Sequence, residues 1–449
     1  MSSIKNLRMV KSEEALGEKM SLFTVPPTDI SSESKGLLVI SNKNPLTDNV
    51  VLFNFEVSGG YMIVPDQIEM EIVGHIANGD GSSIPAMPTS QWSTATDAAK
   101  KKPFFDADVV PANNLFMSLF KHARVKIQDQ YMDFNDFHMK AQLDTILNVT
   151  HGNNERWMSQ LFCEQSGTDG NHYTSITGHP KQNRLSIPLI KVVKKSQKFQ
   201  MRGKPPLDFC EINKYMISRV PISIEFIFNS PETYIRSANT DASFKFVMSE
   251  CKLYVPIIKV RPDIDLANAE TLKHQPVLYP CPRSLLKTYT VSTGNHSFET
   301  EDIFQGMLPM ESLVCMVSSA NYSPGYKNNP FYFQNFKVNT VSLKVDDVTH
   351  TLNMKYGSTG NSQTAQPYLA LMNMFPYLEL SVDDFTDDLP FFVFDTRCNN
   401  SVGSLPMMRK GFTRLEMKFD EALTENITVF VYSKFARVIE ITDTRVVSL

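Results

Sequence analysis

The chain has 449 residues, of which 42% are hydrophobic and 20% are charged. A chain of this length exceeds what one hydrophobic core usually serves, so two domains are expected, and its apolar content argues against disorder. The net charge of -4 disfavours strong, direct binding to nucleic acid, because sequence-independent contacts to phosphates need an excess of basic residues.

Residues 1–30 mix basic and acidic side chains and lack the apolar stretch of a secretory signal. We expect them to form an N-terminal arm, exchanged between neighbouring copies, ahead of the first strand. No apolar run in the chain approaches the roughly 18 residues that span a bilayer, so no membrane span is predicted. The six cysteines are scattered without a CxxC pair, which is typical of free thiols in a reducing compartment.

Alternation of apolar and polar residues with a period of two predicts strands that have one buried face. In the first half of the chain this pattern appears at residues 51–57, 68–72, 222–228 and 244–248. Helical spacing is confined to residues 139–147, which follow the capping candidate Asp136, and to Trp157 with Leu161, so a pair of short helices is predicted there. Residues 79–112 are rich in Ser, Pro, Ala and Thr and predict a long surface loop.

Strand signals end near Val260, and a polar stretch at 261–275 precedes the next strand block at Tyr279. We therefore predict an arm at 1–30, a first sandwich at 31–265 and a second at 266–449. In the second, residues 415–419 and 427–431 alternate and predict a hairpin, and 357–367 predict another loop. Helices do not alternate with strands, which excludes a doubly wound α/β fold and favours an all-β class with two consecutive β-sandwiches.

The sequence contains no HExxH, GxSxG, Walker A or GxGxxG signature. Its nine histidines never occur as HxH or four residues apart, so the local pair of a zinc site is missing. No catalytic, cofactor-binding or metal-binding residue is assigned, and we expect a protein that is not an enzyme.

Two charged clusters are candidates for interface loops. The acidic cluster consists of four aspartates, Asp383, Asp384, Asp387 and Asp388. Carboxylates this close could hold a hard cation, but their spacing does not match a calcium loop, which favours a solvated acidic loop. The basic run that includes Lys194 and Lys195 could contact nucleic acid or an acidic partner, although protection of a strand edge is the favoured interpretation in an acidic chain.

Specific phrases in the second half carry more information than strand pattern alone. The segment at 279–309 reads YPCPRSLLKTYTVSTGNHSFETEDIFQGMLP, and NYSPGYKNNPFYFQNFKVNTVSLKVD, LPFFVFDTRCNN and RKGFTRLEMKF follow in that order. Their content and order resemble the major capsid proteins of Polinton (Maverick) and adintovirus-type elements, and the resemblance covers roughly residues 110–160 and 205–449. The positions that carry it are Tyr279, Pro280, Phe304, Gln305, Gly306, Pro309, Asn329, Pro330, Phe331, Phe394, Asp395, Gly411, Leu415 and Glu416.

This resemblance implies a double jelly roll whose chains form trimers with a six-lobed outline, and these trimers tile an icosahedral shell. The implied partners are other copies of the chain, neighbouring capsomers and a penton or minor capsid protein. The implied location is the virion, with synthesis in the host cytoplasm and assembly inside the cell.

Two alternatives remain open at this point. Exposed aromatics and carboxylate-rich loops would also suit a β-sandwich that binds or cleaves carbohydrate. A domesticated, endogenous relative of a capsid protein would have the same strand pattern and the same phrases.

Overall fold

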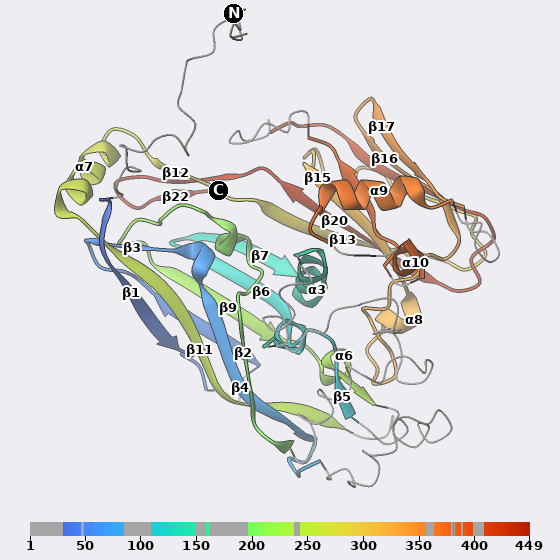
Figure 1. Cartoon of the computed structure of the whole chain (residues 1–449), viewed down its shortest axis with the longest axis horizontal. Helices are drawn as coiled ribbons and strands as arrows, with labels where there is room; N and C mark the ends of the chain where they lie inside the picture. Colours follow the sequence, from blue (N-terminus) through green and yellow to red (C-terminus); the bar gives the residue numbers. More distant parts are fainter. Residues whose placement is uncertain are drawn as a thin grey trace, which may run out of the picture.

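The computed structural model describes residues 30–45, 49–84, 109–148, 159–160, 196–237, 243–355, 363–378, 380, 382–387, 389–397 and 408–449. Antiparallel strands dominate this part of the chain (Figure 1). Within it, no helix is both long enough and apolar enough to cross a bilayer.

The strands of the first half form two main sheets. One sheet has the order β1 (Ser32–Ser41), β11 (Phe244–Val260), β4 (Glu69–Asn78) and β8 (Phe199–Gly203), and the short β3 (Tyr61–Ile63) also pairs with β11. The other has the order β2 (Val50–Phe55), β9 (Ile222–Phe228), β6 (Phe120–Ile127) and β7 (Gln130–Asn135).

The second half repeats this arrangement. One sheet has the order β13 (Arg283–Val291), β20 (Ile427–Phe435), β15 (Glu311–Ser318) and β18 (Phe392–Asp395). The other has the order β14 (Ser297–Glu299), β19 (Thr413–Phe419), β16 (Val338–Val345) and β17 (Val348–Asn353).

Both halves share one strand order. When the eight main strands of each half are numbered along the chain, one sheet runs 1-8-3-6 and the other runs 2-7-4-5. The chain thus crosses between the sheets at every step except the hairpin between the fourth and fifth strands. This double Greek-key order is that of a jelly roll, so the predicted all-β class with two consecutive jelly-roll sandwiches is confirmed.

The prediction of a hairpin between residues 415–419 and 427–431 was wrong. These segments are β19 and β20, the seventh and eighth strands of the second sandwich, and they lie in opposite sheets. Alternation reports only that one face of a strand is buried, and strands of both sheets turn that face toward the same interior. Two facing strands therefore give the same sequence pattern as two paired ones.

Smaller elements surround the two sandwiches. A two-stranded sheet pairs β5 (Val109–Pro111) with β10 (Ile235–Ser237), and a three-stranded sheet has the order β12 (Val277–Pro280), β21 (Val438–Ile441), β22 (Val447–Ser448). The α-helices are α2 (Leu115–Ser118), α3 (Phe137–Asn148), α6 (Pro231–Tyr234), α7 (Pro262–Leu272), α8 (Ser319–Tyr322), α9 (Ala365–Met374) and α10 (Val382–Asp387). The polar stretch expected between the halves contains α7, which is largely exposed.

The first predicted helix is confirmed as α3, which begins directly after Asp136. The second, around Trp157 and Leu161, lies outside the described residues. So do residues 85–108 of the first predicted loop, while β5 occupies its end. The loop predicted at 357–367 was wrong at its end, because α9 begins at Ala365 and buries Pro367 and Leu371 against the sandwich.

Burial alternates along the strands that have one face on the core, whereas β15 and β20 are buried on both faces along nearly their whole length. In β2 the side chains of Val51, Phe53 and Phe55 are buried, and in β19 those of Leu415 and Met417 are fully buried. One continuous cluster of buried apolar side chains extends through both sandwiches. The two sandwiches are therefore packed against each other and not merely joined by a linker.

Three turns of the second sandwich meet at one of its ends. The carboxylate of Asp302 accepts hydrogen bonds from the backbone N–H groups of Gly306 (2.8 Å) and Thr413 (3.1 Å), and Gly411 N–H donates to the Gly306 carbonyl (3.1 Å). The Asp346 carboxylate accepts from Phe412 N–H (2.8 Å). Gly306 has a φ of +90°, which favours glycine. A Cβ atom at Gly411 would overlap with the Asp346 carboxylate.

We predict that Gly411→Ala lowers the free energy of unfolding by about 1–2 kcal/mol, because the Asp346 carboxylate must give up its bond to Phe412. Asp346→Ala should have an effect of similar size. The double variant should be no less stable than Asp346→Ala alone, since both changes remove the same bond. Urea unfolding of the three variants tests this, with Gly36→Ala as the control because the nearest contact of its Cβ, to Ile257 Cγ1, would be at 3.2 Å. Strictly additive losses would contradict it.

Candidate functional site at the junction of the two sandwiches

The helix α3 lies between the two sandwiches (Figure 1). Every described side chain from Phe137 to Leu147 is buried, including four polar residues and one lysine. A helix on a protein surface buries one stripe, whereas a helix covered on all sides must also bury the polar residues of its other faces. The junction is therefore where the structure places buried charges.

Lys140 is the central charge of this junction, and its side chain is 1% exposed. Its ammonium group donates to the Asp144 carboxylate (2.6 Å) and to the Pro206 carbonyl (2.8 Å), and lies 3.5 Å from the Asp208 carboxylate. Lys140 and Asp144 are one helical turn apart on α3, so the helix itself brings them together.

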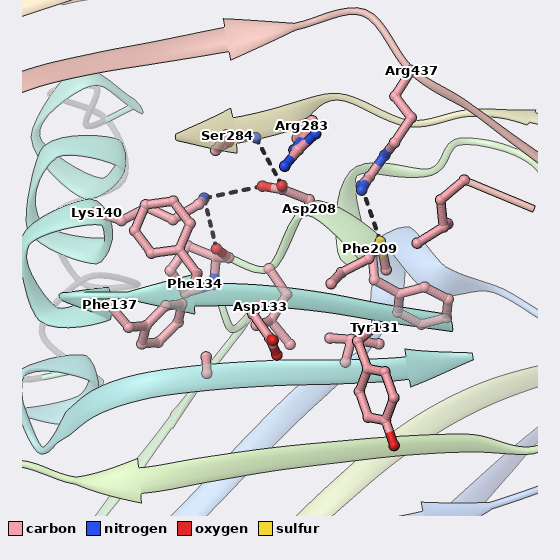
Figure 2. A pocket seen from close by; sticks show the side chains of 16 residues that line it. Tyr131, Asp133, Phe134, Phe137, Lys140, Asp208, Phe209, Arg283, Ser284 and Arg437 are labelled. Carbon is pink, nitrogen blue, oxygen red and sulfur yellow. Dashed lines mark hydrogen bonds and ion pairs between the residues drawn. The ribbon is translucent and has the colours of Figure 1, made fainter. Parts of the chain in front are cut away.

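The second sandwich completes this network. From β20, the Tyr432 hydroxyl donates to the second oxygen of Asp144 (2.8 Å) and lies 3.3 Å from the Ser284 hydroxyl of β13. The backbone N–H of Ser284 donates to the Asp208 carboxylate (2.8 Å), as Figure 2 shows. Each carboxylate of the first half is thus held by one partner from its own half and one from the other.

Burial alone would lower the pKa of the Lys140 ammonium, but attraction to Asp144, Tyr432 and Asp208 outweighs it, and the pKa is raised above its ordinary value. Burial would likewise raise the pKa of Asp144, yet Lys140 holds it below its ordinary value. Both groups are therefore charged in the folded protein. A second lysine, the partly buried Lys434 of β20, has a raised pKa because attraction outweighs its burial. The attracting groups are Tyr432 and Asp144, followed by Glu211 and Glu311, which lie within about 4 Å.

A second set of contacts joins the halves through the sheet β12-β21-β22. The hydroxyl of Tyr279, one of the residues that carry the family resemblance, accepts a hydrogen bond from Ile217 N–H (3.0 Å). Arg445 donates to the Ser218 carbonyl (3.0 Å), and Lys214 donates to the Leu278 carbonyl (3.2 Å). Tyr279 is fully buried. The first of the named positions that carry the resemblance therefore also connects the two halves at the junction.

The other residues of the resemblance are distributed over the second sandwich and do not form one site. Phe304, Phe331, Phe394 and Leu415 belong to its core, where Phe304 meets the Phe435 ring edge-on with centroids 5.0 Å apart. The remaining positions form turns, strand ends and strand surface: Pro280, Gln305, Gly306, Pro309, Asn329, Pro330, Asp395, Gly411 and Glu416. Their partners are local, as in the ion pairs of Asp395 with Arg397 and of Glu416 with Lys418. These positions maintain the fold and do not converge on a catalytic centre.

The acidic cluster was predicted to be a loop, and this was wrong. Asp383, Asp384 and Asp387 belong to the short helix α10, whereas Asp388 lies outside the described residues. The physical reason is Phe385, which is fully buried and packs against Tyr368 of α9 with ring centroids 5.8 Å apart. Lys194 and Lys195 also lie outside the described residues. Of the same basic run, Arg202 lies in β8 at a sheet edge, as strand-edge protection would require.

The junction residues Lys140, Asp144, Asp208 and Tyr432 were missed by sequence reasoning. A Lys–Asp pair four residues apart usually marks an exposed helix face. One feature of the sequence could have indicated the burial of this helix. Apolar and polar residues are mixed around α3, so that no single face is polar enough to face water. Among the described residues, no group of three or more His, Cys, Asp or Glu side chains could hold a metal ion.

We predict that Lys140→Met lowers the free energy of unfolding by roughly 3–5 kcal/mol, because it leaves Asp144 buried without its counter-ion. The matched control is Lys273→Met, which removes the exposed ion pair with Glu270 and should change stability by no more than about 0.5 kcal/mol. Denaturant unfolding of both variants measures this. Equal effects in the two variants would contradict a central role for Lys140.

His138 of α3 makes the free energy of unfolding depend on pH. Its ring is buried and forms a T-shaped pair with Phe331 of the second sandwich, with centroids 6.2 Å apart. Burial, with repulsion from Lys121 and Arg236, lowers its pKa from 6.5 to about 4. The unfolded chain therefore binds a proton between these values that the folded chain does not, so stability falls as the pH drops through that window.

We predict that the free energy of unfolding decreases by up to roughly 3 kcal/mol between pH 7 and pH 4 through His138 alone. The variant His138→Gln should make the free energy of unfolding nearly independent of pH in this range. The control His296→Gln, which changes an exposed histidine, should leave the pH dependence unaltered. Unfolding curves recorded at several pH values decide the matter. An unaltered slope in His138→Gln would refute the assignment.

Comparisons with known proteins identify the fold. No protein-family model and no curated protein matches the sequence. Solved structures match almost the whole chain. A chain of the Sputnik virophage structure, determined by cryo-electron microscopy, is 9% identical with a TM-score of 0.61, and the match covers 99% of this chain and 93% of that one.

Two further matches are structures of major capsid proteins. The Faustovirus protein is 8% identical with a TM-score of 0.52, and the match covers 93% of this chain and 92% of that one. The mavirus protein is 10% identical with a TM-score of 0.50, and the match covers 100% of this chain and 96% of that one. At these identities the likeness concerns the fold. The chain has the double jelly-roll fold of viral major capsid proteins.

Proposed function

We propose that this chain is a structural major capsid protein and not an enzyme. The observation that carries the proposal is the doubled strand order, 1-8-3-6 with 2-7-4-5 in each half, together with end-to-end similarity to two major capsid protein structures. The two rigid sandwiches of one chain have the same strand order, so they present surfaces of similar shape to neighbouring copies. Three such chains would give six lobes, and six-lobed units pack in a hexagonal net, which closes into a shell where units of five-fold symmetry are added.

The buried junction suits this task. A shell subunit must hold its two sandwiches at a constant angle, because each lobe contacts a different neighbour. The Tyr432 hydroxyl of β20 donates to Asp144 of α3, and Ser284 N–H of β13 donates to Asp208. Together with the bonds between the sheet β12-β21-β22 and residues 214–218, they constrain that angle from two sides. We propose residues 31–265 and 266–449 as the two sandwich domains and residues 1–30 as an arm that neighbouring copies exchange.

The collinear phrases of the second half support a finer assignment to the Polinton and adintovirus type. A domesticated copy of such a gene would encode the same subunit. The partners we propose are further copies of this chain, neighbouring capsomers and a penton or minor capsid protein. We propose that the chain is made in the host cytoplasm, assembles inside the cell and resides in the virion.

The test is the mass and shape of the purified full chain in solution. Light scattering should give three times the 50.8 kDa of one chain, and electron micrographs should show six-lobed particles. Lys140→Met serves as a comparison, since a loosened junction should reduce the fraction of regular six-lobed particles. A protein that stays monomeric at micromolar concentration, and that binds glycans on an array, would favour the carbohydrate-binding alternative instead.

A further inference from the structure

A pocket of about 310 Å³ lies at the junction, beside the Lys140 network (Figure 2). One wall comes from the first half, with Tyr131, Met132 and Phe209 among its residues. The other wall carries two arginines of the second half, Arg283 at the start of β13 and Arg437 after β20. A volume of this size is several times the share of one water molecule, so the pocket can hold a small solute.

The acceptors that Arg437 finds are weak. One terminal nitrogen of its guanidinium contacts the sulfur atoms of Met132 (2.9 Å) and Cys281 (3.4 Å) and the carbonyl of Pro282 (3.2 Å). Its Nε–H is buried and has no hydrogen-bond partner. Thioether and thiol sulfurs accept hydrogen bonds poorly, and a guanidinium group offers five N–H donors in a fork that fits two oxygens. Most of this donor capacity is unused.

Arg283 lies exposed at the rim of the same pocket, and its hydrogen bond in the described chain goes to the Met307 sulfur (3.7 Å). Burial of part of its side chain, and then repulsion from Arg437, lowers its pKa. Within the described residues neither arginine has a carboxylate within ion-pair distance. Asp208 attracts Arg283 and offsets part of the repulsion between the two arginines, and an anion between them would offset the rest.

The two aspartates that line the pocket, Asp133 and Asp208, have partners other than the two arginines. Asp208 accepts from Ser284 N–H and faces the Lys140 ammonium. Asp133 accepts from Arg124 outside the pocket. Lys140 is in turn matched by Asp144. The positive charge left over in the pocket is that of the two arginines.

We propose that this pocket binds a small oxyanion, of the phosphate or carboxylate class, between Arg283 and Arg437. The anion would accept hydrogen bonds from both guanidinium groups, including the buried Nε–H of Arg437. An anion that binds the folded chain and not the unfolded one raises the melting temperature, so binding can be followed by thermal unfolding.

The experiment measures thermal unfolding of the full chain while sodium phosphate replaces sodium chloride at constant ionic strength, with sodium acetate as a second series. A saturable rise in melting temperature is expected with at least one of the two anions. A rise with phosphate alone supports a phosphate site, and a rise with acetate supports a site for carboxylates. No saturable rise in either series would overturn the proposal.

The variants Arg283→Gln and Arg437→Gln should each weaken the apparent affinity for the effective anion at least about tenfold, since each removes one of the two forks. The matched control is Arg261→Gln, an exposed arginine paired with Asp263 away from the pocket, which should respond like the unaltered protein. If Arg437→Gln does not fold, Arg283→Gln provides the test, because the Arg283 side chain is exposed at the rim and its replacement should not prevent folding. An undiminished response in Arg283→Gln would overturn the proposal.

Discussion

The structure depends most on the pairing of Lys140 with Asp144 inside a helix that both sandwiches cover. Removing a lysine and an aspartate from water is costly, and their mutual attraction repays that cost only when the remaining donors and acceptors are also satisfied. Here the Pro206 carbonyl accepts from Lys140 and the Tyr432 hydroxyl donates to Asp144, while Asp208 adds its charge 3.5 Å from the ammonium and itself accepts from Ser284 N–H. Tyr432 and Ser284 come from the other sandwich, so separating the sandwiches would remove both of their hydrogen bonds. The relative position of the two halves is therefore specified by polar geometry as well as by apolar contact.

In the described part of each jelly roll, the outer strands of the sheets are paired on one side only. In the first sandwich β1 and β8 end one sheet, and in the second β13 and β18 do so. Charged residues occur on these edges, as with Lys35 of β1 and Arg202 of β8, and charge on an edge discourages indiscriminate pairing with another strand. Such edges remain available to specific neighbours. A repeated, closed assembly is one way in which a sandwich protein covers them.

The residues that carry the family resemblance have structural roles that explain why they occur as short phrases. Gly306 and Gly411 lie where turns approach each other too closely for a Cβ atom or where φ is positive, and Phe304, Phe331 and Phe394 fill the second core. Tyr279 joins that core to the first half through its hydroxyl. The first sandwich uses the same strand order with different side chains, because a jelly roll requires alternation and suitable turns rather than particular residues.

The sequence by itself determined the all-β class, the positions of β2, β4, β9, β11, β19 and β20, the helix after Asp136 and the absence of known catalytic motifs, because alternation and capping are local properties. It did not determine which strands pair, since β19 and β20 show the same alternation in opposite sheets as they would in a hairpin. It also could not show that Lys140 is buried or that Arg283 and Arg437 share a pocket, because these residues come from segments about 140 to 300 positions apart. Only the packing of one sandwich on the other decides which polar groups lose water, and that depends on long-range contacts which no local pattern records.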